Sequence, residues 1–235
     1  MRALAGIIVA AAAIVWAQSA PSRQLSASLL SAAEKGNATE VRSLLRRGAS
    51  PNSANSDGNS LTALMLAARG GHTQVVRLLL QAGATVEATA AVPVGASGMN
   101  EDLTALMEAV ASGNATTVEL LLSHKANPDA RAIYEVIDST GTKHMEGCRP
   151  AIMHAINFAV LRLLAEHGAN LLVKDCDGNS VLMFAAEHLD SATVQYLLRR
   201  GLNPRERNNK GMTALDLARQ AAKTANIEVL DNIPH

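Results

Sequence analysis

Apolar residues recur along this chain in pairs of short segments, each pair followed by polar residues. Residues 62–84 show the pattern: Leu64 and the Ala67-Ala68 pair fall on one side of a short helix, and a Gly-Gly-His break follows. The next segment, "VVRLLL", gives a second helix with a broad apolar side. Gly83 then stands where a left-handed helix C-cap needs no Cβ. The pattern predicts a helix-turn-helix unit.

The same pattern occurs six times within residues 27–230. The copies begin near residues 27, 62, 104, 150, 180 and 213, which are 35, 42, 46, 30 and 33 residues apart. Gly48, Gly168 and Gly201 hold the place of Gly83, and Lys125 holds it in the third copy. The fourth copy, Pro150 to Ala169, lacks about three residues between its helices relative to a regular repeat. Two helices of this length cannot bury their apolar sides alone, so we expect an all-α repeat protein built as a stacked solenoid.

The repeated phrase carries a family resemblance. Thr62-Ala63-Leu64-Met65, Ala67-Ala68, Gly71-His72, Val76, Leu79-Leu80 and Gly83-Ala84 match the ankyrin repeat family position by position. The resemblance implies an ankyrin-repeat solenoid of about six helix-turn-helix repeats with β-hairpin fingers. One departure is consistent: the family's His is replaced by Met65, Met107, Met153 and Met183. We therefore expect the usual Thr–His hydrogen bond to be absent, as in a divergent, bacterial branch.

Two inserts break the period, and both fall in the connections that form fingers in this family. They are Glu87–Asp102 and Arg131–Arg149. The second contains the strand-like "AIYEVID", a turn at residues 139–141 and "TKHM", so it predicts a lengthened hairpin. Tyr134 and Glu135 are candidate contact residues for a partner. The alternative is a solvated loop without a partner.

The resemblance also implies that the concave face of the first helices contacts a partner. The positions flanking the Ala pair vary from copy to copy, whereas the core positions do not. The candidate residues on this face are Leu66, Arg69, Glu108, His154, Asn157, Phe184 and Glu187. For Leu66 and Phe184, packing against a neighbouring repeat is the alternative.

The first residues have the pattern of a secretory signal peptide. Arg2 precedes an apolar run that ends at Val15, and small residues follow. We expect a signal peptide over residues 1–17, with cleavage between 17 and 20, a linker over 18–26 and a tail over 231–235. An uncleaved anchor or an N-terminal helix is the alternative. Cleavage would leave a periplasmic or secreted chain with no stable membrane insertion.

An oxidising compartment permits a bridge between the two cysteines of the chain, Cys148 and Cys176. Both fall at turns of successive repeats. A bridge requires Cα atoms within about 7 Å, so the two fingers would have to lean together. Two free, partly buried thiols are the alternative.

Motifs of catalysis and of cofactor or metal binding are missing from the sequence. It contains no phosphate-binding loop, no dinucleotide fingerprint and no HExxH, and "VGASG" at 94–98 lacks the strand-turn-helix context of a nucleophile. The seven His are scattered, so we expect no metal and no cofactor. The sequons at Asn37 and Asn114 precede second helices, where helix capping explains them better than glycosylation.

Composition fits a binding module. Aromatic residues make up 2% of the chain, which suits many small Ala- and Leu-rich helices. Lys+Arg and Asp+Glu number 21 each, so charge favours neither nucleic acid nor an anionic membrane. We expect a monomeric, non-catalytic module that binds another protein. The alternatives are an accessory factor of a periplasmic stress-defence enzyme and a secreted effector.

Overall fold

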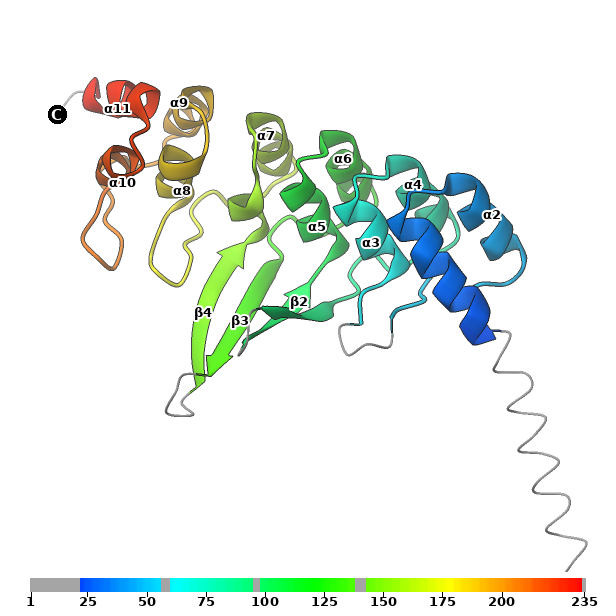
Figure 1. Cartoon of the computed structure of the whole chain (residues 1–235). Helices are drawn as coiled ribbons and strands as arrows, with labels where there is room; N and C mark the ends of the chain where they lie inside the picture. Colours follow the sequence, from blue (N-terminus) through cyan, green and yellow to red (C-terminus); the bar gives the residue numbers. More distant parts are fainter. Residues whose placement is uncertain (1–21, 56–59, 95–97, 138–142, 234–235) are drawn as a thin grey trace, which may run out of the picture.

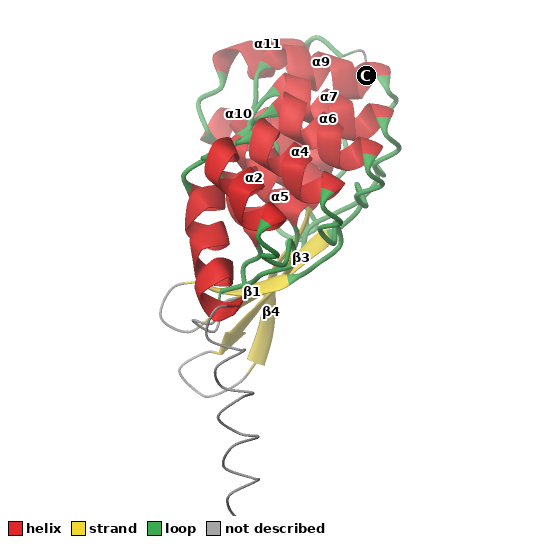
Figure 2. Ribbon diagram, turned by 90° about the vertical axis from the view of Figure 1, so that its right-hand side faces the viewer, coloured by secondary structure: helices red, strands yellow, loops and turns green. Residues whose placement is uncertain are grey.

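Helix pairs stack in series along the molecule in the computed structural model (Figure 1). The described residues are 22–55, 60–94, 98–137 and 143–233, and the side chains at 91–102 and 132–148 lie outside the description. Figure 2 shows the helices in layers, with the strands gathered at one end of them. The predicted signal peptide lies outside the described residues.

One layer holds the first helix of each repeat and the other holds the second. The first helices are residues 22–34, α3 (Ala63–Arg69), α5 (Ala105–Ser112), the 3-10 helix η1 (Ala151–His154), α8 (Val181–His188) and α10 (Ala214–Gln220). The second helices are α2 (Ala38–Arg46), α4 (Thr73–Gln81), α6 (Ala115–Ser123), α7 (Phe158–Glu166), α9 (Ser191–Arg199) and α11 (Thr224–Asp231). The predicted solenoid of six helix pairs is confirmed.

The core runs continuously along the stack. Leu79 and Leu121, in the second helices of successive repeats, are fully buried, and so are the small residues Ala67 and Ala185 of first helices. Helices pack mainly against their partner in the same repeat or against helices of adjacent repeats, such as α3 with α5 and α8 with α10. Because each fully buried Leu contributes roughly 1.5–3 kcal/mol, stacking supplies the stability that an isolated helix pair lacks.

Local side chains fix where the helices begin. Asn37 and Asn114 accept hydrogen bonds from the backbone of Glu40 and Thr117 at 3.1 and 3.0 Å, so the capping interpretation of the two sequons is confirmed. At the first helix of the second repeat, Thr62 Oγ1 accepts from the Met65 backbone N–H at 3.2 Å. The Thr62 N–H in turn donates to Met65 Sδ at 3.4 Å. The expected loss of a Thr–His bond is therefore partly offset by a weaker Thr–Met link.

Side chains at the starts of α6 and α7 also bond the third and fourth repeats to the repeat before each of them. Asn114 Nδ2 donates to the Gly71 carbonyl, and Asn157 Nδ2 donates to the Gly113 carbonyl, each at 3.1 Å. Gly113 has a φ of 72°, and a Cβ there would lie 2.9 Å from Asn157 Nδ2. Glycine is needed at this turn both for its left-handed backbone and for the close approach.

The two lengthened fingers pair with each other, which the sequence did not predict. The strands β1 (Ala90–Val94), β2 (Gly98–Leu103), β3 (Arg131–Ile137) and β4 (Lys143–Pro150) form one antiparallel sheet in the order β1-β2-β3-β4. Gly98 of β2 pairs with Val136 of β3, and this register joins the two inserts. Other fingers are much smaller: the bridges Ala54 to Thr62 and Lys174 to Ser180 are isolated pairs.

Two local expectations need correction. The predicted linker over 18–26 is wrong at its end, because helix begins at residue 22 and continues to 34. In the fourth repeat the first helix is reduced to η1, four residues long, whereas α5 and α8 have eight each. The residues predicted to be missing between the two helices of this copy are therefore missing from the end of its first helix.

Candidate protein-binding site

Arg69 and Glu108, two of the predicted contact residues, bind each other across successive repeats. Arg69 Nε donates to Glu108 Oε2 at 2.9 Å, and Arg69 Nη2 donates to Glu108 Oε1 at 2.5 Å. The bond to Glu108 raises the pKa of Arg69, and burial opposes this shift. Glu108 is 7% exposed, so its carboxylate is engaged with Arg69 and little of it is accessible to a partner. The first-helix face, meaning the surface presented by the first helices, is closed at this junction.

The remaining predicted contact residues occupy different environments. Leu66 and Phe184 are half-buried and pack against the core, as the packing alternative expects, and Glu187 is also half-buried. Asn157 caps α7 by accepting from the Val160 backbone at 3.0 Å, so it starts a second helix rather than ending a first one. The prediction that Asn157 lies on a first helix was wrong. Because this copy lacks residues between its helices, its second helix already begins at this position.

Tyr134 and Glu135 lie on β3, which is an inner strand of the sheet. The backbone of Tyr134 is paired with Asn100 on one side and with Glu146 on the other. The side chains of these residues lie outside the described part of the chain. Their role as contact residues stays a prediction.

The first-helix face opens into a hollow at the shortened repeat. This first-helix hollow has a volume of about 420 Å³ and is lined by Ala111, Arg149, His154, Ile156, Phe184 and His188, among others. The Arg149 guanidinium carbon lies 5.9 Å from the centre of the Phe184 ring. The centres of the Phe184 and His188 rings are 4.9 Å apart. Ile156 is 60% exposed, which is unusual for so large an apolar side chain in the described part of this chain.

The position of the hollow follows from the helix lengths. Ala111 stands in the last turn of α5, and His188 is the last residue of α8. Between these two helices, η1 ends at His154, and the chain turns away through Ala155 and Ile156. We infer that the ends of α5 and α8 extend past η1 and leave the hollow between them.

His154 forms part of the wall and is neutral at pH 7. Burial, and to a smaller extent the nearby Arg149 charge, lower its pKa to about 4, although a hydrogen bond with the Arg149 backbone opposes both effects. Its Nε2 atom is buried and has no hydrogen-bond partner. Arg149 therefore gives the first-helix hollow a permanent positive charge, and His154 contributes uncharged ring surface.

A second hollow adjoins the first. This turn hollow has a volume of about 560 Å³ and is lined by Asn157, Asp190, Ser191, Lys223, Thr224 and Asn226, among others. Ile156, His188 and Leu189 line both hollows. We refer to the two together as the trough. It runs from the first-helix face to the starts of α9 and α11.

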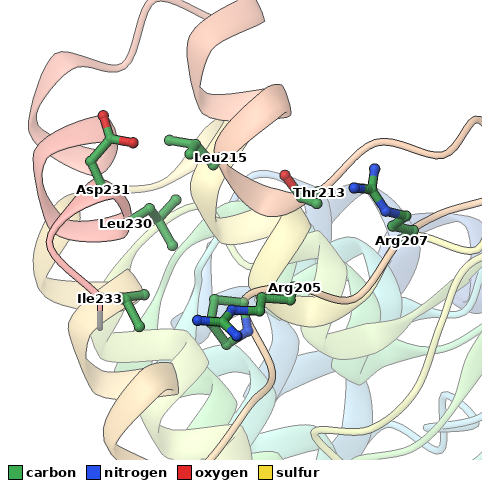
Figure 3. A pocket seen from close by; sticks show the side chains of 8 residues that line it. Arg205, Arg207, Thr213, Leu215, Leu230, Asp231 and Ile233 are labelled. Carbon is green, nitrogen blue, oxygen red and sulfur yellow. The ribbon is translucent and has the colours of Figure 1, made fainter. Parts of the chain in front are cut away.

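A third hollow, of about 270 Å³, lies on the outer side of the last helix pair (Figure 3). Leu215, Leu230 and Ile233 are grouped around it, with Arg205 and Arg207 from the preceding finger. This end hollow lies on the far side of α10 and α11 from the preceding repeat. The candidate contact residues of the first-helix face lie elsewhere.

Most residues of the trough were not among the predicted contacts, and Arg149, Ile156, His188 and Lys223 are examples. The available signal was the shortened fourth copy, since an incomplete first helix leaves space beside its neighbours. Of the predicted residues, His154 and Phe184 line the first-helix hollow, and Asn157 lines the turn hollow. Leu66, Arg69 and Glu108 line neither.

Cys176 is bonded in a disulfide. The side chain of Cys148, its predicted partner, lies outside the described residues, so the pairing stays a prediction. Among the side chains that are described, no three His, Cys, Asp or Glu gather as metal ligands. Within the described residues, no helix is both long enough and apolar enough to span a membrane.

Comparisons with known proteins agree with this architecture. One solved chain comes from the complex of the predatory endopeptidase Bd0816 of Bdellovibrio bacteriovorus with the immunity protein Bd3460. It is 23% identical, with a TM-score of 0.69 over 88% of this chain and 98% of that chain. The human ASB11 ankyrin repeat domain is 25% identical, with a TM-score of 0.66 over 88% and 84% of the two chains. The search of curated proteins gives no match.

A family model described as ankyrin repeats (3 copies) matches residues 29–132 and 143–231. These ranges cover most of the chain and include the helix pairs described above. Ankyrin repeats are protein-protein interaction modules and are generally non-catalytic. The repeated sequence, the stacked helix pairs and the matched family model lead to one conclusion: this chain belongs to the ankyrin repeat family.

Proposed function

We propose that this protein is a non-catalytic module that is exported and binds a protein partner through its first-helix face and fingers. The observation that carries the proposal is the open hollow on this face, where Ile156 is 60% exposed beside the half-buried Phe184 ring. Exposed apolar surface in a hollow with polar groups at its edge is typical of a protein contact site. The pattern of residues 1–17 supports export.

The family supports binding rather than catalysis. Among the described residues, the one strongly shifted pKa that could suit acid-base chemistry belongs to His154. Its Nε2 is buried, and the other residues that line the hollow are Arg149, His188 and apolar side chains, which include no Ser, Thr, Cys or carboxylate that could act as a nucleophile. The similar solved chain comes from a complex of two proteins, which supports a function that consists of holding a partner.

Site-specific photo-cross-linking in the organism that makes the protein tests this proposal. A benzophenone side chain would replace the exposed Glu34 or Ala111 on first helices, or the exposed Glu119 or Gln195 on second helices. We expect one partner to be cross-linked from Glu34 and Ala111, with little product from Glu119 and Gln195. Cross-links that form only from the second helices would contradict the use of the first-helix face.

Export has a separate test. Deleting residues 1–17 should keep the chain in the cytoplasm, whereas the full chain should be recovered outside it. Cell fractionation with an immunoblot measures the distribution. Equal distribution of the two forms would remove export from the proposal and leave partner binding untouched.

A further inference from the structure

The trough is lined by apolar and charged groups in a definite order. At one end, Ile156 and Phe184 offer apolar surface beside the Arg149 guanidinium. At the other end, Lys223 Nζ donates to the His188 carbonyl at 3.3 Å, which uses one of its three donors. An occupant that satisfies this surface needs an apolar group for the first end and hydrogen-bond acceptors for both ends.

The charges of the trough favour an anionic occupant. The Lys, Arg, Asp and Glu side chains that line it are Arg149, Lys223 and Asp190; two imidazoles line it as well, those of His188 and of His154, and His154 is neutral at pH 7. The Asp190 carboxylate caps α9, where it accepts from the Thr193 N–H at 2.9 Å and from the Thr193 hydroxyl at 2.6 Å. It lies at the positive end of the helix dipole, which reduces its repulsion of another anion. The two cations therefore dominate the attraction.

The shape of the trough favours an extended segment. Its two hollows, of about 420 and 560 Å³, meet along Ile156, His188 and Leu189. Each lies within the range of about 300–1,000 Å³ that is typical of ligand pockets. An extended peptide advances by about 3.3 Å per residue and can therefore place separate side chains in successive hollows.

We propose that the trough binds an extended acidic segment of the partner protein, with one apolar side chain packed on Ile156 and Phe184. Carboxylates of the segment lie near Arg149 and Lys223. This inference rests on the proposed function and names the chemistry of the partner. A bidentate carboxylate contact with Arg149 would be a charge-assisted hydrogen bond, which is stronger than a neutral one.

The test uses the full chain and a fluorescein-labelled peptide, Ser-Glu-Phe-Glu-Asp-Ser, as the probe. One control peptide replaces the acidic residues by their amides, and a second replaces Phe by Ala. Fluorescence anisotropy at low salt gives each Kd. We expect the probe to bind at least about tenfold more tightly than either control peptide. Equal affinity for all three peptides, or no binding of the probe, would overturn the inference.

Two surface variants locate the binding. Ile156→Ser should raise the Kd of the probe by at least about fivefold, because the Phe side chain of the probe loses its apolar contact. Leu172→Ser is the matched control, since Leu172 is 78% exposed and does not line the trough. Lys223→Gln should raise the Kd of the probe and make that Kd less dependent on salt. The Kd of the amide control peptide should stay unchanged. Equal losses in Ile156→Ser and Leu172→Ser would also overturn the inference.

A failure of the peptide-binding test can be distinguished from a failure of the proposed function. If the probe fails but a benzophenone at Glu34 still cross-links a partner, the first-helix face is confirmed and the trough is excluded as the peptide site. If both fail, both proposals are wrong. Circular dichroism and urea unfolding of Ile156→Ser check that its fold is unchanged, so that a loss of binding is attributed to the trough.

Discussion

Two junctions between repeats show how the same stacking produces different surfaces. Between the second and third repeats, Arg69 and Glu108 bridge α3 and α5 and close the first-helix face. Between the third and fifth repeats, η1 is four residues long, and a hollow of about 420 Å³ remains. The second helices are packed alike at both places: Leu79 of α4 and Leu164 of α7 are fully buried.

This difference indicates that the first-helix layer and the second-helix layer have separate roles. The second-helix layer maintains a continuous core even where a repeat has lost residues. The first-helix layer can then vary, because a missing turn there opens a surface and leaves the core intact. A repeat protein can therefore gain a binding hollow by shortening one helix.

The largest expected effect tests whether the second-helix layer is the same at both junctions. Leu79→Ala and Leu164→Ala each remove a fully buried side chain, so each should lower the free energy of unfolding by about 2–5 kcal/mol. Urea unfolding followed by circular dichroism measures both. If Leu164→Ala has less than a third of the effect of Leu79→Ala, the shortened repeat is loosely packed and the comparison fails.

The next effect is a pH dependence of stability between about pH 6.5 and 4 that comes from His154 in the shortened repeat. The pKa of His154 is lowered to about 4 in the folded chain, whereas an unfolded His has about 6.5, so the unfolded state binds the proton more readily. Stability is full above about pH 6.5 and falls as the pH drops to about 4. The loss should be on the order of 2–3 kcal/mol, since one pKa unit corresponds to about 1.4 kcal/mol.

Urea unfolding at several pH values, compared with His154→Gln, isolates this contribution. The variant should lose less stability than the wild type between pH 6.5 and 4. The Asp216 carboxyl, whose pKa is lowered chiefly by hydrogen bonds from Thr213, contributes below its ordinary value of 3.8 and remains in both proteins. Identical pH profiles for the two proteins would show that His154 is protonated without penalty.

A smaller effect concerns the closed junction. Glu108→Gln weakens two charge-assisted hydrogen bonds from Arg69 and should lower the free energy of unfolding by about 1–2 kcal/mol. Arg162 and Glu166 form the control pair, with 3.6 Å between their atoms and both side chains 51% exposed. Glu166→Gln should change stability by less than about 0.5 kcal/mol. Equal effects of the two substitutions in thermal or urea unfolding would contradict a special role for Glu108.

The smallest effect sharpens the comparison of helix starts. In Met65→Leu the buried Thr62 N–H loses the sulfur acceptor that lies at 3.4 Å. In the third repeat, Thr104 caps α5, but its backbone N–H makes no such bond to the sulfur of Met107. Met65→Leu should therefore cost about 0.5–1 kcal/mol more than Met107→Leu in urea unfolding. An equal cost would show that the thioether acts only by packing.

The sequence predicted the features of the fold that depend on neighbouring residues. Gly48, Gly83, Gly168 and Gly201 all have positive φ, and Lys125 adopts φ 67° in the same position. The capping of α2 and α6 by asparagine was also predicted. These features follow from the spacing of a few residues and from the absence of a Cβ, so a single repeat contains the information.

The candidate site was predicted only in part. His154 and Phe184 were identified from the repeat pattern and line the first-helix hollow. Arg149, Ile156 and His188 were missed, because their approach depends on where η1 ends relative to α5 and α8. Asn157 was assigned to the wrong helix, because the residues missing from the fourth copy shift the alignment of every later residue of that copy with the other copies.

By itself, the sequence of this protein determined the repeat unit, its caps, the number of stacked helix pairs and the positions of the two inserts. The tertiary structure alone decided that the inserts join in one four-stranded sheet and that a trough crosses the shortened repeat. The physical reason is the range of the interactions. Helix periodicity and capping act within a few residues, whereas strand pairing and unfilled space arise between segments about 40 residues apart, such as Gly98 and Val136.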